Sequence, residues 1–131
     1  MQSILLVDDE PMILRVMRLA LEKVGYQVST AIDGQEALEK IVADPPDILV
    51  TDIEMPRMTG KELCLRILET MPDREFPIFI STSLTAMEHR EWSREVPNLI
   101  FIEKPISIRK LRTAISDFIS AKDTVVLGPA E

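Results

Sequence analysis

The stretch Ile4-Leu5-Leu6-Val7-Asp8-Asp9-Glu10-Pro11 decides the fold, because it joins four apolar residues directly to three acidic residues and a proline. A continuously apolar run is typical of a strand that is buried on both faces, as in a parallel sheet covered by helices. Pro11 suits the first position of a helix, where its missing N–H is not needed. The stretch therefore predicts a buried strand, an acidic turn and a helix in succession.

The same pattern continues along the chain. A weaker apolar run around Val28 suits an edge strand, and three further runs are continuously apolar: Ile48-Leu49-Val50, Ile78-Phe79-Ile80 and Leu99-Ile100-Phe101-Ile102. Longer amphipathic stretches separate the runs and predict helices. Because helices that connect parallel strands pack on the sheet through right-handed crossovers, this order predicts a (βα)5 three-layer α/β sandwich.

Local signals place the ends of the predicted helices. Gly25 ends the first, Asp33-Gly34 begins the second and Thr59-Gly60 begins the third. A mostly polar fourth helix is expected from about residue 85 to 95, and Ser107 is expected to cap the fifth. The apolar residues expected to face the core are Ile13, Met17, Ala20 and Val24 in the first helix, Ala37, Leu38 and Ile41 in the second, Leu63, Ile67 and Met71 in the third, and Ile108, Leu111, Ile115 and Phe118 in the fifth.

Length and composition limit the class of protein. The 131 residues fit one domain, and an apolar content of 46% suffices for a core. Periodicity is lost after about Ala121, so residues 1–121 are expected to form the domain and residues 122–131 a C-terminal tail or the start of a linker. The single cysteine, Cys64, excludes an internal disulfide and a cysteine-rich zinc site.

The charge balance argues against two classes of partner. Fifteen Lys and Arg residues against 22 Asp and Glu residues give a net charge of −7, which suits neither a nucleic-acid surface nor an anionic membrane. No apolar run approaches the ~20 residues that span a bilayer, and no signal peptide follows Met1. We therefore expect a cytoplasmic protein.

Polar residues with related chemistry follow four of the predicted strands. The segments are Asp8-Asp9-Glu10, Thr51-Asp52-Ile53-Glu54, Ser81-Thr82-Ser83 and Glu103-Lys104-Pro105. In open parallel sheets, ligands bind outside the carboxyl ends of the strands. The sequence therefore predicts that carboxylates, a hydroxyl group and a lysine converge on one edge of the sheet.

Carboxylates gathered at one edge need a compensating charge. Asp8, Asp9 and Asp52 would raise one another's pKa and destabilise the fold unless a cation lies among them. Oxygen ligands and open positions suit Mg²⁺, which also favours phosphate oxygens. With Lys104 as a fixed positive charge and a nearby hydroxyl group, the edge is typical of a phosphoryl-transfer site, in which an aspartate can form an acyl phosphate.

These residues carry a resemblance to a known family. The motifs are Leu6-Val7-Asp8-Asp9-Glu10-Pro11, Asp52-Ile53-Glu54-Met55-Pro56 with Gly60, Thr82, and Lys104-Pro105; Asp52 to Thr82 spans 30 residues and Thr82 to Lys104 spans 22. In motifs and spacing, residues 2–121 resemble the receiver domain of two-component response regulators. The resemblance implies a flavodoxin-like fold with strand order 2-1-3-4-5.

The resemblance also implies a role for each acidic residue. Asp52 would accept the phosphoryl group, and Asp9, Asp52 and the backbone carbonyl of Glu54 would bind Mg²⁺ directly. Asp8 would act mainly through a metal-bound water. The Glu54 side chain would flank the site and repel hydroxide, which favours a long-lived phosphoryl group.

A second set of residues would form the switch. Lys104 would pair with Asp52 and later with a phosphoryl oxygen, and Thr82 would move to another phosphoryl oxygen. Phe101 matches the aromatic switch position and would fill the space that Thr82 leaves. Ser83 occupies a modulating position that is usually small, and the peptide bond before Pro105 is expected to be cis.

The phosphoryl donor is expected to be another protein. His89 is the only histidine and falls in a polar predicted helix, so a histidine kinase or a histidine phosphotransfer protein would supply the group. The domain would catalyse only its own phosphorylation and dephosphorylation, without being a conventional enzyme. The surface of the predicted fourth helix, fifth strand and fifth helix would signal to a downstream protein or output domain, and could form a homodimer.

Two other functions remain open from the sequence. One is a receiver-like interaction domain that works without phosphorylation, which the complete set of site residues disfavours. The other is a Mg²⁺-dependent aspartyl-phosphate phosphatase of the haloacid dehalogenase type. That class usually has Asp-x-Asp after the first strand and a substrate-enclosing cap, whereas this chain has adjacent Asp8-Asp9 and no room for a cap.

Overall fold

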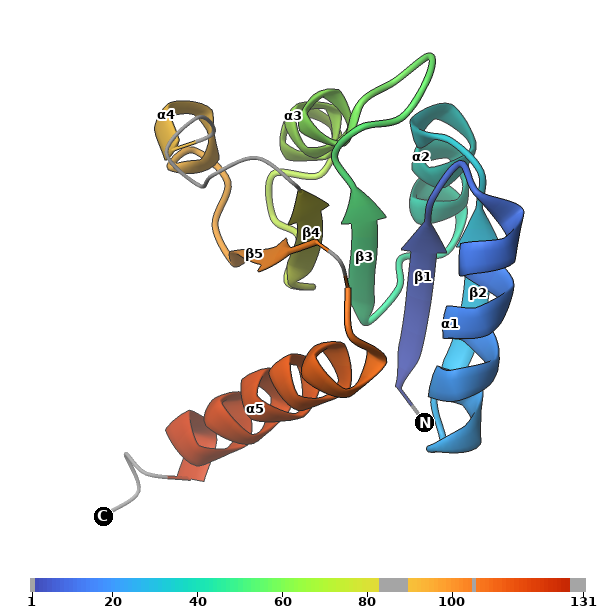
Figure 1. The fold of residues 1–131 in the computed structure, drawn as a ribbon. Helices are drawn as coiled ribbons and strands as arrows, with labels where there is room; N and C mark the ends of the chain where they lie inside the picture. Colours follow the sequence, from blue (N-terminus) through green and yellow to red (C-terminus); the bar gives the residue numbers. More distant parts are fainter. Residues whose placement is uncertain (1, 83–89, 105, 128–131) are drawn as a thin grey trace.

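In this computed structural model, the described part of the chain forms five strands that alternate with five helices (Figure 1). The structure describes residues 2–82, 90–104 and 106–127. The elements are β1 (Ser3–Val7), α1 (Pro11–Lys23), β2 (Gln27–Ala31), α2 (Gly34–Ala43), β3 (Ile48–Asp52), α3 (Gly60–Thr70), β4 (Ile78–Thr82), α4 (Arg90–Ser93), β5 (Leu99–Glu103) and α5 (Ile108–Leu127).

The strands form one parallel sheet in the order β2-β1-β3-β4-β5. This order confirms the predicted flavodoxin-like fold and places β2, the strand around Val28, at an edge. Sequence neighbours in the central strands face opposite sides of the sheet. Leu5 and Leu49 pack in the cluster with α2 and α3, whereas Leu6 and Val50 pack with α1 and α5.

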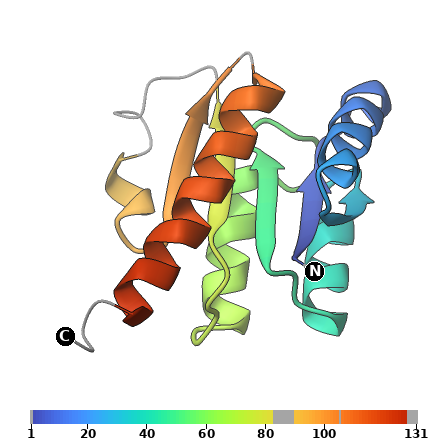
Figure 2. The same ribbon diagram turned by 90° about the horizontal axis from the view of Figure 1, so that it is seen from below.

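The sheet is therefore covered on both faces, as Figure 2 shows for α5 on one side and α3 on the other. All five residues of β3 and of β4 are buried. Double burial explains why the strands are continuously apolar and do not alternate with polar residues. Because the strands are parallel, their carboxyl ends all lie at one edge of the sheet, toward which the arrowheads of β1, β3 and β4 point in Figure 1.

Three helices begin where local signals predicted. Asp33 caps α2 by accepting a hydrogen bond from the N–H of Glu36, and Thr59 forms a capping box with Glu62 at the start of α3. The Ser107 hydroxyl accepts a bond of 3.3 Å from the N–H three residues later. Each cap satisfies a backbone donor that the first turn of a helix leaves without a partner.

The predicted buried face of α1 was partly wrong. Ile13 and Val24, which were expected to face the core, are 38% and 44% exposed. Met17 is buried as predicted, and the structure buries Leu14 and Leu21 in place of Ile13 and Val24. Periodicity could not decide between the two faces, because the helix also carries apolar residues that are exposed, namely Met12, Val16 and Leu19.

Two predicted boundaries lie in the C-terminal half of the chain. The expected start of the fourth helix, near residue 85, lies outside the described residues, and the described part of α4 is Arg90–Ser93. Helix α5 continues to Leu127, past Ala121, where loss of apolar periodicity suggested a tail. Loss of an apolar stripe removes a reason for burial but does not end a helix, since extending an existing helix costs little.

No helix in the part of the chain that the structure describes is long and apolar enough to cross a membrane.

Gly60 holds the start of α3 against the end of β3. Its N–H donates to the carbonyl of Ile53 at 2.8 Å. A Cβ at this position would lie 2.5 Å from the Asp52 carbonyl oxygen and 2.7 Å from the Ile53 Cα. Both neighbours are backbone atoms that cannot rotate away, so glycine is required for this close approach.

We expect Gly60→Ala to lower the free energy of unfolding by about 1–3 kcal/mol, the usual cost of forcing extra atoms into packed structure. Urea unfolding measures the change. The control is Lys61→Ala in the same turn, an exposed position where the change should stay within about 0.5 kcal/mol. Equal stability of the two variants would contradict the close approach.

Candidate functional site

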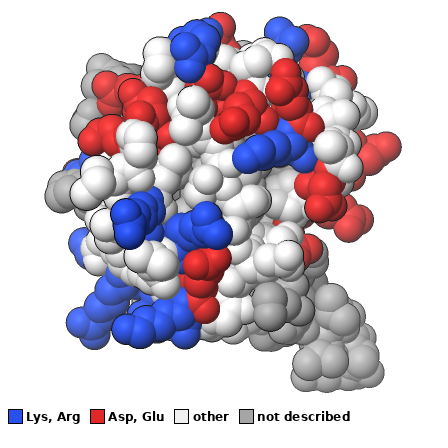
Figure 3. All heavy atoms as spheres, turned by 90° about the vertical axis from the view of Figure 1, so that its right-hand side faces the viewer, with Lys and Arg blue, Asp and Glu red and all other residues white. Residues whose placement is uncertain are grey.

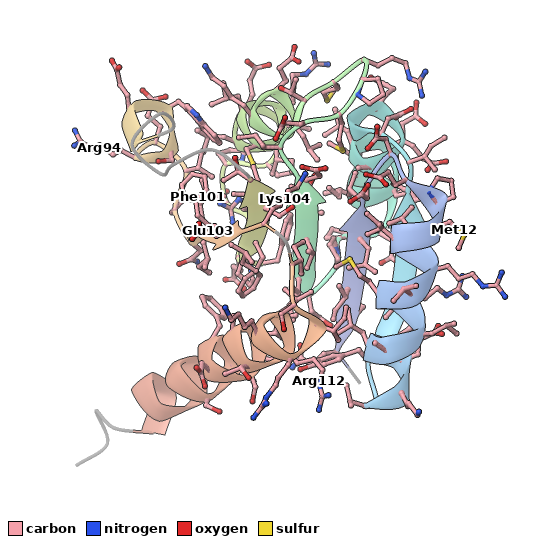
Figure 4. All side chains as sticks on the ribbon, in the orientation of Figure 1. Met12, Arg94, Phe101, Glu103, Lys104 and Arg112 are labelled. Carbon is pink, nitrogen blue, oxygen red and sulfur yellow. The ribbon has the colours of Figure 1, made fainter. Side chains whose placement is uncertain are left out.

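Four of the predicted site residues meet at the carboxyl edge of the sheet. Asp8 follows β1, Asp52 ends β3, Thr82 ends β4 and Lys104 follows β5. The backbone joins the last two, because the Lys104 N–H donates to the Thr82 carbonyl at 3.0 Å. Figure 4 labels Lys104 at this edge, and Figure 3 shows that acidic side chains gather toward the same end of the molecule.

Asp52 and Lys104 form the central contact of the site. The Lys104 Nζ lies 2.9 Å from both carboxylate oxygens of Asp52. Asp52 is buried, with 5% of its side chain exposed, and its Oδ1 also accepts a 3.1 Å bond from the N–H of Glu54. A buried carboxylate is thus matched by one ammonium group, as burial of a charge requires.

The acidic surroundings keep Lys104 charged. Burial alone would lower the pKa of Lys104, but the hydrogen bond to Asp52 and the negative charges of Asp52, Glu54 and Asp8 outweigh it, so the pKa is raised. The ammonium group is therefore a permanent positive charge at neutral pH, available to any anion that reaches Asp52.

Asp8 is an acidic residue whose surroundings make its ionised form unfavourable. Burial, together with the negative charges of Asp52, Asp9 and Glu10, raises its pKa from 3.8 to about 6, even though its carboxylate accepts a hydrogen bond from the Glu10 N–H. That bond, to Oδ1, is 2.9 Å long. Near neutral pH the protein must hold this charge at a cost, which a bound cation would remove.

The first acidic turn has the donor set of a hard-cation site. Asp8, Asp9 and Glu10 each offer a carboxylate oxygen, and these oxygens lie within 4.8 Å of one another. Oxygen donors and a buried carboxylate that resists ionisation fit Mg²⁺. Glu10 was not among the predicted metal residues, although its place in the acidic run was a signal for it.

The predicted switch residues occupy neighbouring strands. Thr82 is buried at the end of β4. Phe101, on β5, is half-buried and packs edge-on against Trp92, with ring centroids 6.4 Å apart at 78°. The Phe101 side chain thus connects β5 to α4 through its contact with Trp92. Ser83 and Pro105, which complete the predicted set, lie outside the described residues, as does His89.

Comparison with known proteins identifies the family. The family model described as the response regulator receiver domain matches residues 4–116. This chain belongs to that family. The match confirms the family that the sequence predicted. Receiver domains are the phosphorylation-operated modules of two-component systems.

Curated relatives of this receiver domain are longer proteins. Response regulator MprA of Mycobacterium ulcerans is 36% identical over 108 residues, covering 82% of this chain and 46% of MprA. The alkaline phosphatase synthesis transcriptional regulatory protein PhoP of Bacillus subtilis is 32% identical over 114 residues, covering 87% of this chain and 47% of PhoP. The chain spans about half the length of these relatives.

Solved structures with the same fold match the domain nearly end to end. The chemotaxis protein CheY4 of Vibrio cholerae has a TM-score of 0.81 at 30% identity, covering 89% of this chain and 98% of that one. Response regulator TrrA of Thermotoga maritima, solved in complex with Mg²⁺ and BeF, has a TM-score of 0.76 at 29% identity with the same coverage.

The raised pKa of Asp8 leads to a pH-dependent prediction for the metal-free receiver. Protonated Asp8 contributes stability below about pH 4, and this contribution is lost as the pH rises through about 6. We therefore expect Asp8→Asn to gain stability relative to wild type between pH 4 and pH 7. Urea unfolding in EDTA at several pH values measures this difference.

Asp9→Asn is the matched control, because Asp9 is acidic, adjacent and exposed. Its stability relative to wild type should change less with pH than that of Asp8→Asn. Adding Mg²⁺ should stabilise wild type more than Asp8→Asn. A stability difference between Asp8→Asn and wild type that stays constant from pH 4 to pH 7 would contradict the electrostatic cost assigned to Asp8.

Proposed function

We propose that Asp52 is the phosphoacceptor of this receiver domain. The observation that supports it is the buried Asp52 carboxylate, held on both oxygens by Lys104 beside an acidic turn. An Asp52 oxygen would attack the phosphorus of a phosphohistidine, forming a P–O bond while the P–N bond breaks. The imidazole nitrogen keeps the bonding electron pair and takes up a proton, and Asp52 becomes an acyl phosphate.

Mg²⁺ is the proposed cofactor. Asp9, Asp52 and the backbone carbonyl of Glu54 would hold it directly, and Asp8 would act mainly through a bound water. When bound, Mg²⁺ supplies positive charge that offsets the charge of the transferred group. The complex of TrrA with Mg²⁺ and BeF supports this assignment, since TrrA shares the fold at 29% identity.

Lys104 and Thr82 would bind the oxygens of the transferred phosphoryl group. The Lys104 ammonium is already centred on the carboxylate oxygens, so it can turn to a phosphoryl oxygen with little movement. Thr82 lies on the neighbouring strand end and can offer its hydroxyl to another oxygen. Charge-assisted hydrogen bonds to a dianion are strong enough to favour one packing arrangement over another.

Phe101 would carry the change to the surface. Movement of Thr82 toward Asp52 frees space that the Phe101 ring can enter, and this ring now packs on Trp92. The surface of α4, β5 and α5 would then differ between the two states, as a population shift. We propose that this surface is the output and also the contact of a homodimer.

Receiver domains interact with histidine kinases and with downstream targets. We propose that this chain is cytoplasmic, that its phosphoryl donor is a histidine kinase or a histidine phosphotransfer protein, and that its target is a downstream protein or output domain. The domain would catalyse only its own phosphorylation and dephosphorylation. The side chains of Glu54 and Ser83 would set the lifetime of the phosphoryl group, with Glu54 favouring a long one.

The direct test is intact mass after incubation with acetyl phosphate and Mg²⁺. We expect one phosphoryl adduct, absent in Asp52→Asn and in the presence of EDTA. Lys104→Met should keep Mg²⁺ binding but accumulate little adduct. Mg²⁺ binding with no adduct from acetyl phosphate or a phosphotransfer protein, and with no beryllofluoride complex, would favour a phosphorylation-independent interaction domain.

The switch can be followed through Trp92, the only tryptophan. Because Trp92 contacts the Phe101 ring, beryllofluoride with Mg²⁺ should change its fluorescence. The change should be lost in Asp52→Asn and reduced in Thr82→Ala. Phe101→Leu should alter the starting fluorescence and blunt the response. An unchanged spectrum in a protein shown to bind beryllofluoride would rule out the proposed route through Phe101.

A further inference from the structure

The loop between β3 and α3 controls the surroundings of Asp52. Its ends are drawn together by the hydrogen bond from the Gly60 N–H to the Ile53 carbonyl, at 2.8 Å. Glu54 lies in this loop, and its N–H binds the Asp52 carboxylate. Its carbonyl is the proposed backbone ligand of Mg²⁺. The conformation of the loop therefore decides how two groups of Glu54 are presented to the site.

The far side of this loop is strained. Arg57 has a φ of 65°, in the left-handed region that side chains other than glycine rarely adopt. This conformation carries an energetic cost for an ordinary residue, because its Cβ lies too close to the following carbonyl oxygen. Another interaction must offset it, because a strained backbone persists only where its surroundings hold it.

The Arg57 side chain supplies such an interaction. Its Nε and Nη2 atoms donate to Oδ2 of Asp33, at 3.0 and 2.6 Å. The other oxygen of Asp33 accepts the N–H of Glu36 at 2.8 Å and so caps α2. Asp33 is buried, with 9% of its side chain exposed, whereas the Arg57 side chain is 65% exposed. Glu36 and Arg57 together hold the pKa of Asp33 below its usual value, so the carboxylate is charged at neutral pH.

A second contact lies beside the first. Met58 packs so closely on Gly34 that a Cβ there would lie 2.7 Å from the Met58 Cβ. Two consecutive loop residues thus rest on the first turn of α2, and Figure 1 shows the loop leaning from the top of β3 toward that helix. The loop is fastened at its base by Gly60 and at its far side by α2.

We propose that Arg57 and Asp33 are a positioning pair that fixes the β3–α3 loop, so that Glu54 is preorganised for Mg²⁺ and for the acceptor carboxylate. Neither residue touches Asp52. The pair acts through the backbone, by holding Arg57 in its strained conformation. This inference rests on the proposed function, because it concerns the metal ligand that the loop presents.

Two substitutions can remove the ion pair and still preserve the backbone conformation at Arg57 and the cap that Asp33 provides to α2. Arg57→Asn removes the ion pair but tolerates the left-handed conformation. Asp33→Ser removes the ion pair but keeps a side chain that caps α2. Partners of metal ligands commonly contribute about 10–100-fold to affinity, and this pair acts one step further away, so each variant should weaken Mg²⁺ binding by about 3–10-fold.

Calorimetric Mg²⁺ titration measures the affinity, and hydrogen exchange at the Glu54 amide in metal-free protein measures the order of the loop. Exchange should be faster in both variants. The double variant should be no worse than either single one, since residues that act as a unit are not additive. Arg57→Lys, which restores a charge but not the two bonds, should be intermediate.

Arg18→Gln is the matched control, because it breaks an exposed Arg–Glu pair on α1, between Arg18 and Glu22, away from the loop. It should leave both the Mg²⁺ affinity and the Glu54 exchange unchanged. Wild-type affinity in Arg57→Asn and Asp33→Ser, or additive losses in the double variant, would overturn the positioning role. If the wild-type protein itself binds no Mg²⁺, the proposed function fails. Separately, unchanged hydrogen exchange at the Glu54 amide in the variants would overturn the role of the pair in ordering the loop.

Discussion

The structure depends on how one edge of the sheet accommodates negative charge. Parallel strands deliver Asp8 and Asp52 to neighbouring positions, where both are buried. Burial and mutual repulsion disfavour ionised carboxylates, and the raised pKa of Asp8 shows the cost. Lys104, which follows β5, forms its ion pair with Asp52. The fold thus keeps a charge imbalance at its site, and this imbalance makes the site receptive to a cation.

The same imbalance explains how a small chemical change could alter a surface. Lys104 is the fixed partner of Asp52, so any group added to that carboxylate must be placed against the ammonium. The Lys104 N–H also binds the carbonyl of Thr82, which links the charge partner to the hydroxyl-bearing strand. On β5, the strand that precedes the lysine, Phe101 packs against Trp92. The ammonium group of Lys104, the hydroxyl of Thr82 and the ring of Phe101 therefore lie in neighbouring parts of the structure that contact one another.

The sequence predicted the features that arise from local patterns. Continuous apolar runs identified doubly buried strands, and Asp33 and Thr59 marked helix starts. Residues at strand ends predicted which polar side chains would come together, because strand order in a parallel sheet fixes which ends are neighbours. The buried face of α1 could not be predicted in the same way, since apolar residues such as Val16 occur on its exposed side as well. The pairing of Arg57 with Asp33 was also missed, because a contact between two loops depends on the folded chain and leaves no periodic signal.

The most direct test of the account is calorimetric titration of the wild-type protein with Mg²⁺ at pH 5 and pH 7.5, in buffers of different ionisation enthalpy. If the acidic edge holds an unfavourable charge, Mg²⁺ should bind more tightly at pH 7.5. At pH 5, binding should release protons, because Asp8 must ionise to accept the cation. Equal affinity at the two pH values without proton release, or no binding at either, would contradict the account.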